Sequence, residues 1–135
     1  MPESLARLVK RERTGGKPLP SVFPVFESNK IVFRRSSVMM IAGCPGSMKS
    51  MLTLAMTDEM RVPTLYLSSD SDSFTMSSRL LARATSSTSE EAEKMMSDDP
   101  DFASDVLAEY GHIRWNFHPS PSLDDIWLEA EAHLE

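Results

Sequence analysis

The chain has 135 residues, a length typical of one domain, and its 41% hydrophobic and 25% charged content indicates a globular protein. A net charge of −6 excludes a uniformly basic nucleic-acid-binding protein, and a single cysteine excludes an internal disulfide framework and a cysteine-based zinc site. No apolar run approaches the roughly 20 residues of a membrane-spanning helix. We therefore expect a cytoplasmic protein with no membrane partner.

Charge is distributed unevenly along the chain. Residues 1–50 contain nine basic and three acidic residues, whereas residues 51–135 contain five basic and seventeen acidic residues. This split indicates either a dipolar molecule or a piece cut from a larger one. The acidic part would repel DNA, so a nucleotide or a protein is the ligand that we expect for the chain alone.

The first 20 residues are predicted to form a basic helix and a linker. From Pro2 to Arg13 the helical spacing places apolar residues on one face and basic residues on another, namely Leu5, Leu8 and Val9 against Arg7, Lys10, Arg11 and Arg13. Glycine and proline residues between positions 15 and 20 then end the helix. A solvated face and a contact with nucleic acid or a partner remain equally good interpretations of this helix.

The rest of the chain, residues 21–135, alternates predicted strands and helices. We expect a short strand at Ile31–Phe33 and a buried strand at Val38–Ala42, a continuous apolar run of the kind found in parallel sheets. The later elements expected are strands at Thr64–Leu67 and His112–Phe117 and helices at Met51–Met60, Ser73–Ala84, Glu90–Met96, Asp101–Tyr110 and from Ser122 or Leu123 to the end. This order predicts an α/β fold with a mainly parallel sheet and flanking helices.

A candidate phosphate-binding loop lies between the apolar run and the following helix. Gly43, Lys49 and Ser50 match the pattern G-x-x-x-x-G-K-[ST], and Gly46 adds an inner glycine. In such a loop the backbone N–H groups surround a phosphate, the lysine bridges the β- and γ-phosphates, and the serine hydroxyl binds Mg²⁺. The predicted phosphate-binding residues are Gly43, Cys44, Pro45, Gly46, Ser47, Met48, Lys49 and Ser50.

Met48 departs from the pattern, which has glycine before the lysine. That glycine often adopts a positive φ, where another residue costs roughly 1 kcal/mol or more. Phosphate binding is therefore expected to be weakened. An ordinary turn that happens to precede Lys-Ser is the alternative, but the strand and helix expected on either side favour the phosphate-binding loop.

Two segments resemble the RecA/DnaB-type hexameric ATPases, in particular the phage replicative helicases of the DnaB-like group. They are Val38–Ser50, VMMIAGCPGSMKS, and Thr64–Ala82, TLYLSSDSDSFTMSSRLLA. In that family the second strand runs into a Ser-x-Glu step whose carboxylate polarises the attacking water. The resemblance thus implies catalytic roles for Lys49 and Asp70, with Asp72 as a fallback. The residue chemistry alone makes a helix N-cap an equally good role for Asp70.

The resemblance further implies a partial RecA-like P-loop NTPase fold that binds ATP and Mg²⁺, with Ser50 as the metal ligand. The complete protein would form hexamers and move on DNA during replication or recombination in a bacterial host cell. Family members hold Mg²⁺ with a Walker B aspartate on a strand after a helix such as Ser122–Glu135, and no such strand follows here. We therefore expect residues 21–135 to be an ATPase domain truncated before that strand, with little hydrolysis of its own.

A non-enzymatic phage interaction protein is the alternative. It would use a degenerate ATPase scaffold to bind a host or replication protein through its acidic, methionine-rich part. Met48, the missing strand and the charge of residues 51–135 motivate this hypothesis.

Overall fold

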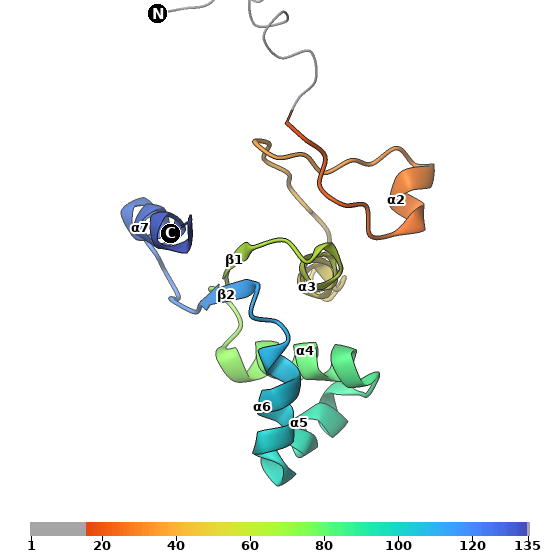
Figure 1. Ribbon diagram of the computed structural model, residues 1–135, viewed down its shortest axis with the longest axis vertical. Coiled ribbons are helices and arrows are strands. Elements are labelled where there is room, and N and C mark those ends of the chain that lie inside the picture. Colours follow the sequence, from red (N-terminus) through yellow and green to blue (C-terminus); the bar gives the residue numbers. More distant parts are fainter. Residues whose placement is uncertain (1–15, 135) are drawn as a thin grey trace, which may run out of the picture. The chain divides into compact units, whose positions relative to one another are not determined.

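The computed structural model describes residues 16–134 and divides into two compact units, residues 1–52 and residues 53–135 (Figure 1). The predicted basic helix Pro2–Arg13 lies outside the described residues, and the predicted domain boundary at residue 20 stays a prediction. Between residues 16 and 134, no helix combines the length and the apolar content that crossing a membrane requires.

A loop in the first unit is closed by an isolated antiparallel bridge between Pro18 and Arg34. Within it, the short helix α2 (Pro24–Ser28) begins at a proline, whose fixed φ suits the first helical position. The ring of Phe26 packs against that of Phe33, with 5.5 Å between centroids. The predicted strand Ile31–Phe33 is wrong. These residues form no strand, and the bridge at the next residue, Arg34, is isolated and does not continue into a ladder of strand hydrogen bonds.

The predicted buried strand Val38–Ala42 is also wrong. These residues adopt no strand, and the side chains of Val38 and Met40 are 101% and 84% exposed. A strand requires a neighbour for its N–H and C=O groups, and within residues 16–134 no backbone group pairs with this run. The apolar pattern is strand-like, but the described part of the chain supplies nothing for it to pair with.

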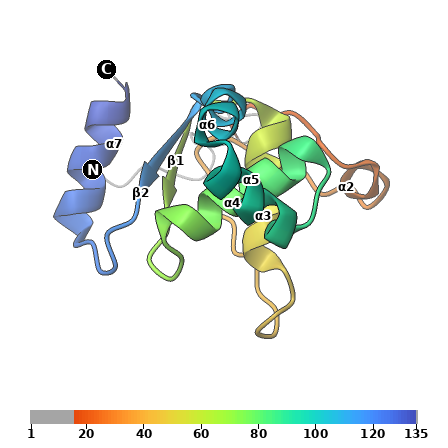
Figure 2. The ribbon, with the colours of Figure 1, turned by 90° about the horizontal axis from the view of Figure 1, so that it is seen from below.

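The second unit contains a two-stranded parallel sheet, which confirms the expected mixed α/β class in its coarse form (Figures 1 and 2). Strand β1 (Thr64–Leu67) pairs with β2 (Ile113–Asn116) in the register Thr64↔Ile113 to Leu67↔Asn116. The N–H of Ser68 extends the ladder by donating to the Asn116 carbonyl at 2.9 Å. Three helices connect the strands, and with the helices outside this connection the described chain is mostly helical.

The connecting helices are α4 (Ser73–Thr85), α5 (Ser89–Asp98) and α6 (Pro100–Ala108), and each begins at a side-chain cap. The caps are Asp72, Thr88 and Asp99, residue types whose oxygens accept the unpaired N–H groups of a first helical turn. The three helices pack together around small and branched side chains, the buried set being Leu81, Ala82, Ala92 and Ala103. These helices were all predicted, within one or two residues at most ends.

The last helix, α7 (Leu123–Leu134), lies beyond β2 on the side away from α4–α6 (Figures 1 and 2). Its start was predicted, and Ser122 and Asp125 form a reciprocal cap, with the Asp125 N–H donating to Ser122 Oγ at 3.1 Å. The side chains of Leu123, Trp127 and Leu128 are exposed. Unlike α4–α6, this helix contributes little to the core of the second unit.

Candidate functional site

The predicted phosphate-binding loop forms an exposed turn that leads into helix α3 (Lys49–Met60). The Ser47 N–H donates to the Cys44 carbonyl at 3.2 Å and closes the turn. The loop curls back over Gly43 so closely that a Cβ there would lie 2.7 Å from Ser47 Oγ. A larger residue at position 43 would therefore require the Ser47 hydroxyl to rotate away.

Lys49 folds back onto the loop that precedes it. Its Nζ donates to the carbonyls of Gly43 and Cys44, both at 2.9 Å, and approaches Ser47 Oγ at 3.4 Å. An ammonium group is thus held at the loop, where the motif requires a cation for phosphate. The ammonium group is therefore near the loop, bonded to its carbonyls.

Two residues of the loop have left-handed backbone conformations. Gly46 has a φ of 76° and Met48 a φ of 59°. Met48 therefore adopts the positive φ that a glycine supplies elsewhere, at a strain cost of about 1–2 kcal/mol for a residue with a Cβ. Its side chain is 69% exposed, so it points away from protein atoms. The methionine does not prevent the turn from forming.

The first turn of α3 suits an anion. It contains no acidic residue, and its first intrahelical bond runs from the Leu52 N–H to the Met48 carbonyl at 2.9 Å. The N–H groups before Leu52 sit at the positive end of the helix, which favours negative charge. Ser50 lies in this turn and is half-buried. Its role as a Mg²⁺ ligand stays a prediction, and residues 16–134 contain no group of three metal-ligating side chains.

Asp70 and Asp72 follow strand β1 in the second unit and have different surroundings. Asp72 Oδ1 accepts a hydrogen bond from the Thr75 N–H at 2.7 Å and caps α4. This hydrogen bond holds the pKa of Asp72 below its ordinary value. The alternative role of Asp70 as a helix N-cap is therefore wrong, because Asp72, two residues later, is the N-cap of α4. Asp70 is exposed at the carboxyl end of β1, the edge at which parallel sheets bind ligands.

Tyr66 indicates where the Asp70 charge acts. Burial raises the pKa of Tyr66, the Asp70 carboxylate raises it further, and Arg79 opposes them. The Tyr66 ring packs on that of its register partner Trp115, with 4.8 Å between centroids. The charge of Asp70 thus acts on the Tyr66 hydroxyl, which belongs to an aromatic pair on the sheet. The phosphate-binding loop belongs to the first unit and Asp70 to the second.

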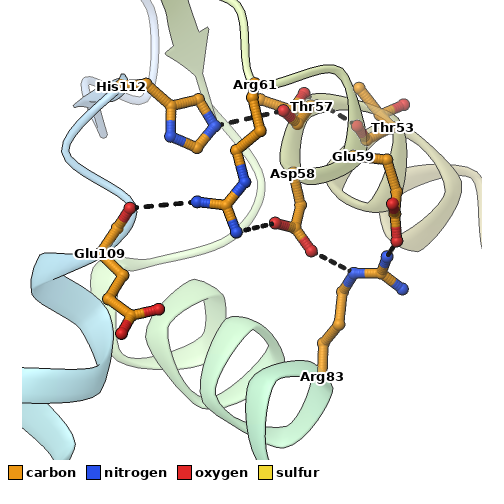
Figure 3. A network of polar contacts seen from close by, with 8 residues as sticks. All are labelled: Thr53, Thr57, Asp58, Glu59, Arg61, Arg83, Glu109 and His112. Carbon is orange, nitrogen blue, oxygen red and sulfur yellow. Dashed lines mark hydrogen bonds and ion pairs between the residues drawn. The ribbon is translucent and has the colours of Figure 1, made fainter. Parts of the chain in front are cut away.

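A charge network that the sequence analysis missed surrounds the buried carboxylate of Asp58 (Figure 3). Asp58 on α3 is 7% exposed and accepts from Arg83 Nε on α4 at 2.6 Å. Its other oxygen pairs with Arg61 at 3.2 Å, and Arg61 also donates to the Glu109 carbonyl at 3.2 Å. Arg83 further contacts Glu59. The Asp58–Arg61 spacing of three residues was visible in the sequence, whereas the partner at position 83 was not.

The same network continues to the residue before β2 (Figure 3). The ring Nε2 of His112 lies 3.3 Å from the Thr57 carbonyl, and Thr57 Oγ1 donates to the Thr53 carbonyl at 2.9 Å. The Arg61 guanidinium lies over the Tyr110 ring, 5.1 Å from its centroid. The ion pairs join Asp58 to Arg61 and Arg83, and Arg83 to Glu59, so the network is structural.

Comparison with known proteins shows similarity to two phage proteins. The chain is 36% identical over 115 residues to the Gene 65 protein of Mycobacterium phage L5, covering 84% of this chain and 42% of that relative. It is 40% identical over 92 residues to the Gene 65 protein of Mycobacterium phage D29, covering 66% of this chain and 38% of that relative. The chain therefore spans about two fifths of the length of these curated relatives. No family model and no solved structure matches it.

The expected likeness to phage proteins is confirmed by these two relatives. The predicted ATPase and helicase activity, the cofactors and the partners are proposals, and they depend on the geometry of the loop.

Proposed function

We propose that the loop Gly43–Ser50 binds a nucleoside triphosphate with Mg²⁺, as the ATP-binding portion of a DnaB/RecA-like helicase ATPase in a phage-infected bacterial cell. The observation that carries this proposal is the position of Lys49. Its ammonium bonds two loop carbonyls at 2.9 Å in a loop with left-handed residues at positions 46 and 48. The motif places a lysine here for contact with the β- and γ-phosphates, and an ammonium group held at the loop agrees with that role.

In this function Lys49 would hold the β- and γ-phosphates and Ser50 would offer its hydroxyl to Mg²⁺. By the same resemblance Asp70 would orient the attacking water, as a carboxylate one methylene shorter than the glutamate of that family. The complete protein would assemble as a hexamer and contact DNA. We expect the chain to bind nucleotide and to hydrolyse it slowly, because Ser50 is the one Mg²⁺ ligand that the motif assigns within residues 43–50.

Displacement of a fluorescent ATP analogue tests the proposal. We expect displacement by ATP, ADP and inorganic triphosphate, and none by adenosine, because the loop binds phosphates. Displacement by adenosine alone would contradict the phosphate-binding role. Rapid Mg²⁺-dependent hydrolysis by the 135-residue chain that is lost in Lys49→Ala would contradict the claim of slow turnover.

A second candidate function, binding a host or replication protein, is favoured by the helices α5 and α6. Residues 88–109 contain eight acidic residues and one basic residue. This surface would attract a basic partner and repel DNA. Co-purification of one stoichiometric partner with a chain that binds no nucleotide would favour this function over the first.

A further inference from the structure

The loop of residues 17–35, which carries α2 in the first unit (Figure 1), borders a pocket of about 330 Å³. The Leu19 N–H donates to the Phe33 carbonyl at 2.8 Å and closes the loop. Inside the loop, the Ile31 N–H donates to the Phe26 carbonyl, also at 2.8 Å. All four of these residues line the pocket. Its walls are therefore held in place by backbone hydrogen bonds as well as by side-chain packing.

The interior of the pocket is apolar and partly aromatic. The rings of Phe26 and Phe33 line it, with centroids 5.5 Å apart and an interplanar angle of 54°. Both residues are half-buried, so their rings pack on each other and still present surface to the pocket. A cavity of about 150 Å³ with an apolar lining holds benzene, and this pocket, about twice that size, has room for a two-ring molecule.

Charged side chains lie around the pocket, and positive charge predominates among them. Lys30 and Arg34 line it together with Glu27. All three residues are exposed, which places their charges at the mouth of the pocket rather than in its apolar interior. The surroundings have the same sign, since residues 17–52 contain five basic residues and one acidic residue. An anion is therefore attracted to the mouth of the pocket, and a cation is repelled.

Arg34 is placed to bind the charged end of a ligand. Its Nη1 donates to the Gly16 carbonyl at 3.4 Å, which holds the guanidinium near the bridge that closes the loop. A guanidinium has five N–H donors in a planar fork that matches the two oxygens of a carboxylate. One donor is used within the loop, so the others remain for a ligand at the mouth of the pocket.

We propose that this pocket binds an aromatic monocarboxylate. The rings of the ligand contact Phe26 and Phe33, and its carboxylate binds Lys30 and Arg34. A flat ring system is favoured over a flexible chain, because it packs against aromatic rings and loses less conformational freedom on binding. The site is separate from the loop Gly43–Ser50 and goes beyond the proposed nucleotide binding, so each can fail without the other.

Calorimetric titration of 2-naphthoate into the full chain tests the role of charge. We expect saturable binding at one site per chain that Arg34→Gln weakens about tenfold, because charge-assisted hydrogen bonds to the carboxylate are lost. Arg35→Gln is the matched control and should bind as the wild type does, since the pocket is lined by Arg34 and not by its neighbour. The uncharged 2-naphthamide should bind about tenfold more weakly than 2-naphthoate. No binding of 2-naphthoate, or equal binding by Arg34→Gln and the wild type, would overturn the proposal.

Nuclear Overhauser effects from the protons of bound 2-naphthoate test the position of the site. We expect them at the rings of Phe26 and Phe33, whereas effects confined to the exposed run Val38–Ala42 would overturn the proposal. Decanoate, an aliphatic carboxylate, should bind more weakly than 2-naphthoate, and tighter binding would contradict the aromatic class of ligand. Lys49→Ala should bind 2-naphthoate as the wild type does, and inorganic triphosphate should not displace it. These two results separate the pocket from the proposed function, and displacement by triphosphate would contradict a separate site.

Discussion

Arg83 Nε donates to the buried Asp58 carboxylate at 2.6 Å and connects α4 to the last turns of α3. The Arg83 side chain is 28% exposed and that of Asp58 is 10% exposed, so water screens the pair only in part. Since Arg61 reaches the other oxygen of the same carboxylate, Asp58 lies between two guanidinium groups. Loss of either guanidinium partner would leave part of the buried negative charge uncompensated and would destabilise the fold.

We predict that Arg83→Met lowers the free energy of unfolding by about 2–3 kcal/mol, because it leaves a buried carboxylate with one partner fewer. The measurement is urea unfolding followed by circular dichroism. Glu59→Gln, which changes the exposed partner of the same arginine, should cost less than about 1 kcal/mol. Equal costs for the two substitutions would show that Asp58 is not effectively buried.

Met48 gives a prediction for the loop. We expect Met48→Val to weaken nucleotide binding about tenfold, because a β-branched residue strongly disfavours the positive φ at this position. Met48→Gly should preserve binding or tighten it. The matched control is Met40→Val, which changes an exposed methionine outside the loop. If valine at position 48 binds nucleotide as well as methionine does, the left-handed turn is not the binding conformation.

Substitutions of Asp70 and Asp72 should have different effects, one on catalysis and the other on stability. We predict that Asp72→Ala lowers the midpoint of thermal unfolding, because α4 loses its cap, whereas Asp70→Ala leaves the midpoint unchanged. In the slow hydrolysis that we expect of the chain, Asp70→Ala should instead lower kcat. A stability loss at Asp70 that matched the loss at Asp72 would assign both residues to the helix end.

The same cap predicts a pH dependence. The folded pKa of Asp72 lies below its ordinary value of 3.8, so its ionised form stabilises the fold. That contribution is fully present above the ordinary pKa and is lost as pH falls through the folded value. The difference in midpoint between the wild-type chain and Asp72→Ala should therefore be constant near neutrality and shrink below about pH 4. A difference that grows on acidification would contradict the role of the cap.

The exposed run predicts an unusual tolerance to polar substitution. Val38→Ser with Met40→Ser should change the free energy of unfolding by less than about 0.5 kcal/mol, because both side chains are already in solvent. Binding of a hydrophobic dye should fall in the same variant. As a control, Leu54→Ala at a fully buried position should cost about 2–5 kcal/mol. A comparable cost at positions 38 and 40 would show that the run is buried in solution.

Local patterns predicted much of the second unit. Strand β1 was predicted at its observed bounds, and helices α4–α7 were found from caps and spacing that act within a few residues. The residues that cap α4 and α7 lie directly before those helices, so local chemistry is sufficient to place their starts. The parallel pairing of β1 and β2 followed from the alternation of strands and helices.

The errors came from features that depend on distant residues. Val38–Ala42 has the composition of a buried strand, but composition cannot supply a neighbouring strand. The Asp58–Arg83 pair spans 25 residues, and no periodicity predicts it. In the loop, the motif indicated where a lysine is needed, but only the structure shows that Lys49 contacts Gly43 and that Met48 adopts a positive φ.

Calorimetric titration of Mg²⁺-ATP into the wild-type chain and into Lys49→Ala tests the central claim most directly. We predict saturable binding at one site per chain that Lys49→Ala weakens at least about tenfold, because the ammonium that meets the phosphates is lost. Lys17→Ala, which removes a lysine of the same unit outside the loop, should bind as the wild type does. Equal binding by Lys49→Ala and the wild type, or no binding by either, would contradict the assignment of Gly43–Ser50 as a phosphate-binding loop.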